Sequence, residues 1–127
     1  MRIYIASKYI DHREINRRIY AALNAEGFDA FLPETINIDA ITDAEMQSVG
    51  ETCYNELSSC DVILVIAPIG LSVACEIAYA IALNREFKRK MKIIVYGEIQ
   101  KREAMIQPYI DKSVSNVYEL ISYLHSI

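Results

Sequence analysis

The stretch that decides the fold is Cys60-Asp-Val-Ile-Leu-Val-Ile-Ala-Pro-Ile-Gly-Leu-Ser-Val-Ala-Cys-Glu-Ile-Ala-Tyr-Ala-Ile-Ala-Leu-Asn84. From Val62 to Ala67 every residue is apolar, which is typical of a strand whose two faces are both covered by helices. The Pro and Gly that follow end the strand, and Ser72 is expected to cap the next helix. Val73 to Leu83 has the Ala-rich pattern of a helix lying close to a sheet. The stretch therefore predicts a strand, a turn and a helix from the middle of a parallel sheet.

Glu76 is the residue of this stretch that is most suited to take part in a reaction. The turn before it lies at the carboxyl edge of the predicted sheet, where open α/β sheets bind ligands. Glu76 falls in the expected first turn of the helix, where backbone amides and the helix dipole favour an ionised carboxylate. Such a carboxylate could act as a nucleophile. First-turn glutamates are also common because they stabilise helix starts, so position alone does not assign a role.

The same stretch resembles the nucleoside 2-deoxyribosyltransferase superfamily, which includes the 2'-deoxynucleoside 5'-phosphate N-hydrolases. In that family an apolar strand opened by Asp leads through a small-residue turn into a helix starting with Glu-(Leu/Ile)-Gly-(Tyr/Arg)-Ala. Ile3-Tyr-Ile-Ala-Ser7 is similar to the opening strand of the family, and Ala104-Met-Ile106 to a short segment after the fourth strand of the hydrolases. The resemblance covers nearly the whole chain, but only residues 60–84 are distinctive.

The resemblance implies a site around Glu76, with this residue as the catalytic nucleophile. It places Tyr4 where the family has a Tyr that orients the carboxylate, although a core aromatic is an equally good interpretation. Ser72 and the amides at the helix start would contact the sugar or an attached phosphate, and Ser7 would share this crevice as a substrate-binding residue. Arg13, in the first turn of the next helix, could hold a phosphate, while a solvated arginine is the simpler interpretation.

Three positions depart from the family pattern, and each concerns the substrate. Cys53 lies eight residues before Asp61, where the family has an Asp, and a thiol is only a weak hydrogen-bond donor. Gly70 lies where the transferases tend to have Asp and the hydrolases Ser. Glu103 lies where the hydrolases tend to have a phosphate-contacting Ser, and a carboxylate there would repel a phosphate. We therefore include Cys53 and Gly70 among the predicted substrate-binding positions.

Composition predicts a single domain spanning residues 1–127. The chain is 53% hydrophobic and 24% charged, and its length is sufficient for one core. No apolar run is long enough to cross a membrane and the N-terminus does not resemble a signal peptide, so we expect a cytoplasmic protein without a membrane partner. The net charge of -4 argues against nucleic acid as a partner. The one basic cluster, Arg85 to Lys92, is most simply a solvated helix end.

Neither a metal site nor a cofactor is expected. Cys53, Cys60 and Cys75 are scattered in apolar surroundings, which indicates reduced thiols, and no pair has zinc spacing. The two histidines lie at opposite ends of the sequence. The sequence also lacks G-x-G-x-x-G and the P-loop, which argues against a dinucleotide bound in the usual Rossmann manner.

Alternating strands and helices along the chain predict a three-layer α/β fold with about five parallel strands in the flavodoxin- or Rossmann-like order 2-1-3-4-5. This order would bring Tyr4, the Ser7–Asp11 loop and Glu76 to one crevice. A loop over residues 34–41 could cover it. The other expected strands are residues 2–6, 28–32, 91–96 and 113–115. The other expected helices run from residue 11 or 12 to 26, from 42 to 58, and onward from Asn116. The buried stripe expected for the helix over 42–58 consists of Met46, Val49, Cys53 and Leu57.

The leading functional hypothesis is cleavage or transfer of the N-glycosidic bond of a (deoxy)nucleoside or nucleotide through a covalent glycosyl-Glu76 intermediate. The base, the sugar, the need for a 5'-phosphate and the choice between hydrolase and transferase stay open. One alternative is a non-catalytic nucleotide-binding or signalling module of the same fold, which the three departures favour. Another is a TIR-like NAD glycohydrolase, supported by analogy of fold alone.

The resemblance also implies a homodimer or a larger homo-oligomer in which a neighbouring subunit completes the pocket. Tyr54, Met105 and Tyr109 would suit such an interface, but they could equally belong to the core.

Overall fold

A parallel sheet in the order β2-β1-β3-β4-β5 forms the centre of the structure. The structure, a computed structural model, describes residues 1–8, 10–35 and 42–127. Within these ranges the strands are β1 (Arg2–Ala6), β2 (Asp29–Phe31), β3 (Val62–Ile66), β4 (Lys92–Tyr96) and β5 (Lys112–Val114), and the α-helices are α1 (Arg13–Ala25), α2 (Asp43–Ser58), α3 (Leu71–Glu86) and α4 (Val117–Ser126). Short 3-10 turns occupy Pro33–Thr35 and Gln107–Tyr109. The predicted fold class and strand order are confirmed.

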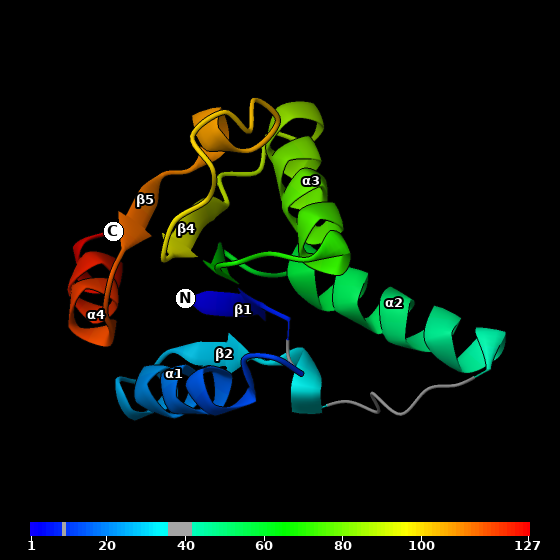
Figure 1. The fold of residues 1–127 in the computed structure, drawn as a ribbon, viewed down its shortest axis with the longest axis horizontal. Coiled ribbons are helices and arrows are strands. Elements are labelled where there is room, and N and C mark those ends of the chain that lie inside the picture. Colours follow the sequence, from blue (N-terminus) through cyan, green and yellow to red (C-terminus); the bar gives the residue numbers. More distant parts are fainter. Residues whose placement is uncertain (9, 36–41) are drawn as a thin grey trace.

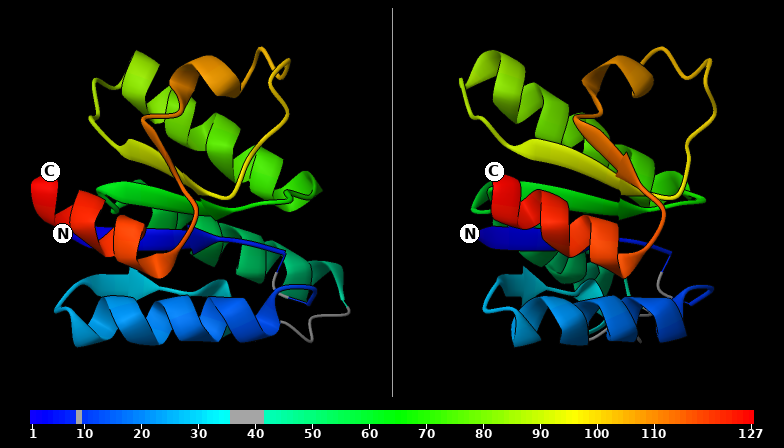
Figure 2. Two further views of the ribbon diagram at one scale, coloured as in Figure 1. Left: turned by 60° about the vertical axis from the view of Figure 1, so that its left-hand side comes forward. Right: turned by 90° about the vertical axis from the view of Figure 1, so that its left-hand side faces the viewer.

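Helices cover both faces of the sheet, which explains why β3 is apolar throughout (Figures 1 and 2). Successive side chains of a strand point to opposite faces. Ile63 and Val65 pack in the layer that contains residues of α2 and α3, whereas Val62, Leu64 and Ile66 pack in the layer that contains residues of α1 and α4. Burial on both sides places β3 at the centre of the sheet, between β1 and β4.

Two of the predicted helix starts have side-chain caps. The Thr42 hydroxyl oxygen accepts a hydrogen bond from the Glu45 backbone amide at 3.1 Å, and Asn116 Oδ1 accepts one from the Glu119 amide at 2.9 Å. Each cap satisfies one of the amides that a helix start leaves without a partner inside the helix.

The start of α3 differs from the prediction. The helix begins at Leu71, its N-cap is Gly70, and the Gly70 carbonyl accepts the first helical hydrogen bond from Ala74 at 3.0 Å. Ser72 therefore lies inside the first turn and does not cap the helix. Glu76 consequently lies in the second turn, so the prediction that it belongs to the first turn is wrong.

The predicted buried stripe of α2 is also wrong in part. Leu57 is buried, but Val49 and Cys53 are half-buried and Met46 is 52% exposed. Figure 1 shows the reason, because the N-terminal half of α2 extends away from the sheet and lies over none of the described strands. The apolar side of this half of the helix faces a cavity instead of the core.

The predicted covering loop falls mainly on residues 36–41, which lie outside the described residues. In the part of the chain that is described, no helix is both long and apolar enough to span a membrane.

Candidate active site

The candidate site lies where the carboxyl ends of β1 and β3 meet. These two strands are neighbours, with Tyr4 opposite Ile63 and Ala6 opposite Val65. The chain leaves them in opposite directions across the sheet, to β2 and to β4. Open α/β sheets have a crevice at such a point. Ser7 follows β1 directly, and the residues after β3 lead into α3 and Glu76.

A cavity of about 460 Å³ occupies this position, between the ends of β1, α2 and α3. Its polar side chains are Tyr4, Ser7, Cys53, Ser72 and Glu76, and its apolar part includes Pro33, Met46, Val49 and Tyr54. The volume lies in the range typical of small-molecule sites. A cavity lined by both polar and apolar side chains suits a ligand that has a hydroxylated part and a flat apolar part.

Tyr4 and Glu76 contribute two polar atoms that are buried without a hydrogen-bond partner. Tyr4 is fully buried, and its ring packs against Phe31 with 5.4 Å between the centroids. Neither the Tyr4 hydroxyl nor Glu76 Oε2 makes a hydrogen bond to any residue that the structure describes. Such orphaned atoms are uncommon in folded proteins because each costs desolvation free energy. Their occurrence together beside one cavity points to a ligand or a water molecule that forms the missing hydrogen bonds.

Burial raises the pKa of the Glu76 carboxyl from 4.5 to about 7, while the nearby Tyr4 hydroxyl acts in the opposite direction by favouring the charged form. The Tyr4 hydroxyl acts on Glu76 as a nearby hydrogen-bond donor would, although the two groups do not meet the full geometry of a hydrogen bond in this structure. The expectation that the helix dipole keeps Glu76 ionised is not met, because the residue lies beyond the first turn and desolvation dominates. A carboxyl with a pKa near 7 can gain or lose a proton at neutral pH.

The two groups beside Glu76 are neutral at this pH. Burial, followed by the charge of Glu76, raises the pKa of Tyr4 well above its usual value of 10.0. Burial also raises the pKa of the Cys53 thiol, against a smaller opposing effect of the Tyr4 hydroxyl. Tyr4 is thus a proton donor toward Glu76, and Cys53 is an uncharged, weak donor.

Five of the seven predicted site residues line this cavity, namely Tyr4, Ser7, Cys53, Ser72 and Glu76. The Ser7 hydroxyl also lies 3.2 Å from His12 Nδ1, so the N-cap residue of α1 positions it.

Arg13 and Gly70 do not line the cavity. Arg13 is exposed at the start of α1. Gly70 lines a neighbouring cavity of about 480 Å³, together with Glu98 and Glu103. A Cβ on Gly70 would lie 2.9 Å from Lys8 Cε, so the glycine leaves room for the Lys8 side chain.

Several lining residues were not predicted from the sequence as site residues. Met46, Val49 and Gly50 of α2 and Cys75 of α3 line the cavity. The Tyr54 ring also lines it and packs against Tyr79 with 4.9 Å between centroids. The available signal in the sequence was the helical spacing of apolar residues. The same spacing is typical of a helix face buried in the core, so the sequence alone does not distinguish cavity-lining residues from core residues.

No group of three or more His, Cys, Asp or Glu side chains within the described ranges could hold a metal ion. Tyr54 and Tyr109 are partly exposed and Met105 is largely exposed, so none of the three residues considered for an interface is a core residue.

No family model matches this sequence, and no curated protein is significantly similar to it. Solved structures are similar to it, however. The 2-deoxyribosyltransferase of Bacillus psychrosaccharolyticus matches 94% of this chain and 90% of its own, with a TM-score of 0.71 and 14% identity. The CMP N-glycosidase of Clostridium botulinum matches 99% and 98%, with a TM-score of 0.61 and 13% identity. A 2-deoxyribosyltransferase of Leishmania mexicana matches 75% and 63%, with a TM-score of 0.56 and 17% identity. These proteins share the fold of this chain, which is the fold that the resemblance predicted.

Proposed function

We propose that this protein cleaves or transfers the N-glycosidic bond of a nucleoside through covalent attachment of the sugar to Glu76. The observation that carries the proposal is the pair of buried, unpartnered atoms, the Tyr4 hydroxyl and Glu76 Oε2, beside one cavity of nucleoside size. Two solved structures of the same fold are a 2-deoxyribosyltransferase and a CMP N-glycosidase, which supports the same class of reaction here.

In the proposed reaction the ionised Glu76 carboxylate attacks the anomeric carbon of the sugar. A carbon–oxygen ester bond forms, the carbon–nitrogen bond to the base breaks, and the base leaves with the bonding electrons and takes up a proton. Water, or a second base, then attacks the same carbon, loses a proton that balances the one taken up by the first base, and releases the sugar from Glu76. The carboxylate is regenerated, so the cycle needs no oxidant, metal or cofactor.

Tyr4 is proposed as a positioning residue for this nucleophile. Its hydroxyl keeps its proton because its pKa is raised, so it can donate to the Glu76 carboxylate and lower the pKa of that group. This counteracts part of the burial effect and increases the ionised fraction of Glu76 at neutral pH. Cys53, a weak donor, would contribute mainly shape to the sugar side of the cavity.

The cavity lining favours an uncharged nucleoside over a nucleotide. Among the described lining residues there is no Lys or Arg, and Glu76 is the one acidic side chain. The neighbouring cavity adds the carboxylates of Glu98 and Glu103, which would repel a phosphate. Met46, Val49 and Tyr54 offer an apolar surface for the base.

We also propose that two or more subunits assemble around the exposed rim of this cavity. Met46 and Tyr54 of α2 line this cavity and are exposed, and the exposed Leu71 at the start of α3 lines the neighbouring cavity. An apolar rim of this kind is stabilised when a second surface covers it. Sedimentation of the wild type against a Leu71→Glu variant tests this, because a charge at the rim should favour monomers.

The proposed activity is tested by measuring base release from a panel of deoxynucleosides, ribonucleosides, their monophosphates and NAD. Glu76→Gln removes the nucleophile while keeping the shape of the side chain. Glu51→Gln, at an exposed position of α2, removes the same charge elsewhere and serves as the control.

We expect release of base from a nucleoside with wild type and Glu51→Gln and none with Glu76→Gln. Rapid acid quenching should also reveal protein whose mass has increased by one sugar. Release that persists in Glu76→Gln would exclude Glu76 as the nucleophile. No release from any compound, with the protein folded, would contradict the enzyme proposal and favour a nucleotide-binding module.

A further inference from the structure

Another cavity lies at the opposite end of α3 from Ser72 and Glu76. It has a volume of about 370 Å³ and is lined by residues from the last turn of α3, the start of β4 and the segment before β5. Because α-helices rise about 1.5 Å per residue, the nine residues from Glu76 to Arg85 separate the two places by about 13 Å along the helix. The cavity is therefore at the amino edge of the sheet, away from the candidate active site.

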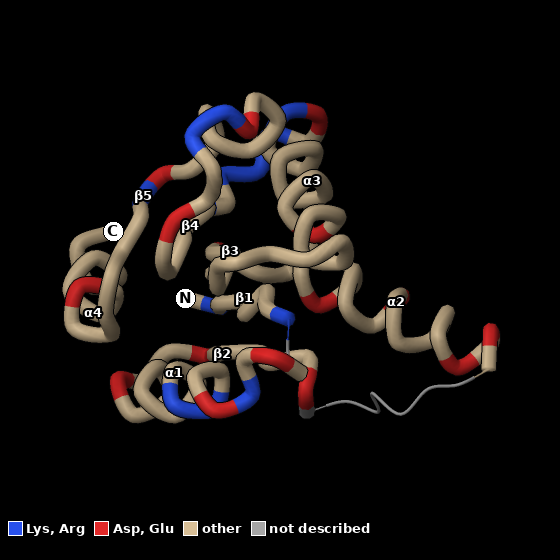
Figure 3. The backbone as a smooth tube through the Cα atoms, in the orientation of Figure 1, with Lys and Arg blue, Asp and Glu red and all other residues tan. Residues whose placement is uncertain are grey.

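Its charge is unusual for this protein. Arg85, Arg89, Lys90 and Lys92 line it, and Asp111 is its one acidic residue in the described part of the chain. Four positive charges and one negative charge leave a formal charge of +3 in a protein whose net charge is -4. Figure 3 shows Lys and Arg gathered around the end of α3 and the start of β4. The negative end of the α3 dipole offsets only about half of one charge.

The local structure leaves most of this charge unpaired. Lys92 Nζ lies 3.8 Å from Asp111 Oδ1, which accounts for the one acidic group. Arg89 donates to the backbone carbonyls of Ser58 and Cys60, which are neutral acceptors. Arg85 and Lys90 have no ion pair with any described residue.

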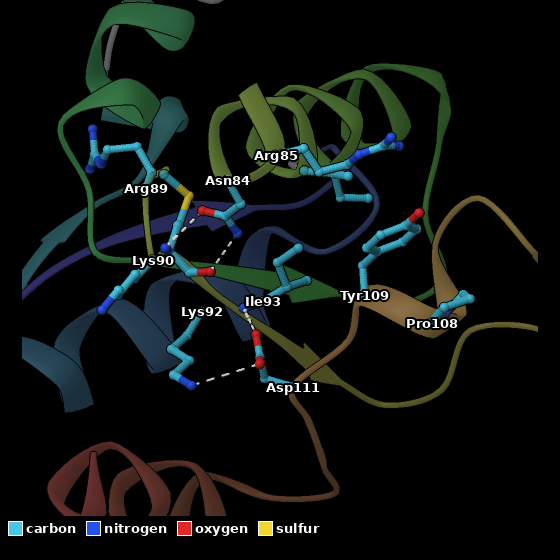
Figure 4. Close-up of a pocket in the computed structure, with 11 residues that line it drawn as sticks. Asn84, Arg85, Arg89, Lys90, Lys92, Ile93, Pro108, Tyr109 and Asp111 are labelled. Atoms are coloured by element: carbon cyan, nitrogen blue, oxygen red, sulfur yellow. Dashed lines mark hydrogen bonds and ion pairs between the residues drawn. The ribbon is translucent and has the colours of Figure 1, made fainter. Parts of the chain in front are cut away.

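The cavity walls are held in place by hydrogen bonds. Asn84 binds both the amide and the carbonyl of Met91 at 2.9 Å, and Asp111 Oδ2 accepts from the Ile93 amide at 2.8 Å. These bonds are drawn in Figure 4. The backbone segments that carry the basic side chains are thus held in place before a ligand binds, which reduces the conformational entropy lost on binding.

Figure 4 also shows how the basic groups are distributed. The Arg85 side chain extends toward Tyr109 on one side of the cavity, and Arg89 and Lys90 lie on the other side. The groups surround the cavity and do not converge on one point. A single phosphate would reach few of them, whereas two linked phosphates would reach more.

We propose that this amino-edge cavity binds a small anion with two or more linked phosphates, at a site separate from the Glu76 cavity. The cations supply the attraction, and Tyr109 offers a hydroxyl and a ring face beside Arg85. The interpretation of Arg85 to Lys92 as a solvated helix end is thereby extended, because these side chains enclose a cavity.

The test follows amide NMR shifts while inorganic pyrophosphate, and in a second arm adenosine diphosphate, is added at low salt. We expect saturable shifts at Ile93, Asp111 and their neighbours with both probes. An Arg85→Ser/Lys90→Ser variant should bind about tenfold more weakly, since two screened charge contacts are worth roughly 1.4 kcal/mol together. Both residues are exposed, so the variant should fold normally.

Two controls make the result specific. Arg18→Ser removes one charge from α1, on the other side of the molecule in Figure 1, and should leave the affinity nearly unchanged. Asp111→Asn removes the one carboxylate and should tighten binding, because less negative charge then opposes the phosphates. The amide oxygen of Asn can still accept from the Ile93 amide, so the local structure should be kept. Tighter binding of the diphosphate nucleotide than of pyrophosphate would assign the nucleotide as the natural ligand class, and equal binding would assign the linked phosphates alone.

The proposal is overturned if neither probe gives saturable shifts at this cavity. It is also overturned if the double variant binds as tightly as wild type, or if the shifts occur only around Glu76. None of these results depends on whether the protein releases a base, so this test and that of the proposed function can fail separately.

Discussion

Replacing Glu76 by Gln should stabilise the protein, and more so as the pH rises. Burial raises the pKa of this carboxyl from 4.5 to about 7. Between these values the folded protein binds a proton that the unfolded chain has already released. Stability contributed by this group therefore decreases as the pH rises from 4.5 to about 7, and the loss is complete above that range. Gln has the same shape and no charge, so the variant does not lose this stability as the pH rises.

The magnitude follows from the difference between the two pKa values. A difference of about 2.5 corresponds to about 3 kcal/mol, at about 1.36 kcal/mol per pKa unit. The side chain is partly exposed, so this is an upper bound. From the same two values, the advantage of Glu76→Gln should grow by about 2 kcal/mol between about pH 5.5 and about pH 8.5. This is a large fraction of the typical stability of a domain, about 5–15 kcal/mol.

Urea denaturation of wild type and Glu76→Gln at these two pH values measures the difference. Comparing pH values cancels the intrinsic cost of burying an amide, because that cost does not depend on pH. Glu51→Gln again controls for net charge. An advantage that is constant with pH, or that declines as the pH rises, would refute the conclusion that Glu76 is buried at a cost.

Three further outcomes are expected. Tyr4→Phe removes the hydroxyl that favours the charged form of Glu76, so the acid limb of the kcat/KM profile should move to higher pH, and an unmoved limb would exclude the positioning role. Leu57→Ala, at a fully buried site, should cost about 2–5 kcal/mol in urea denaturation, whereas Met46→Ala on the exposed half of the same helix should cost about 0.5 kcal/mol or less. Arg89→Met leaves two backbone carbonyls without their donor and should lower the free energy of unfolding by about 2 kcal/mol; equal stability would show that water replaces it.

The sheet and much of the site could be predicted because they depend on local patterns. The apolar run of β3 requires burial on both faces, and that requirement places it in the middle of a parallel sheet. The order 2-1-3-4-5 then places Tyr4 on the strand next to β3 and brings Ser7 and the start of α3 to the same edge. Thr42 and Asn116 act through amides only three residues away, so their capping could be inferred from sequence.

The start of α3 could not be predicted with the same certainty. The helix begins two residues earlier than expected, after a β3–α3 connection whose backbone path depends on tertiary contacts, including the approach of Lys8 to Gly70. This shift moves Glu76 out of the first turn. Its protonation then depends on the surrounding burial, which no spacing along the chain encodes.

The sequence by itself thus determined which segments form strands and helices and which carboxylate lies near the carboxyl edge of the sheet, because hydrophobic periodicity and capping act over a few residues. Only the tertiary structure decided that α2 extends past the sheet, so that its apolar side lines a cavity, and that the pKa of Glu76 is raised to about 7. Only the structure brought Arg85, Lys92 and Tyr109 together around the amino-edge cavity. Each of these features depends on what lies across space from a side chain, and burial, charge and cavity shape are properties of that arrangement.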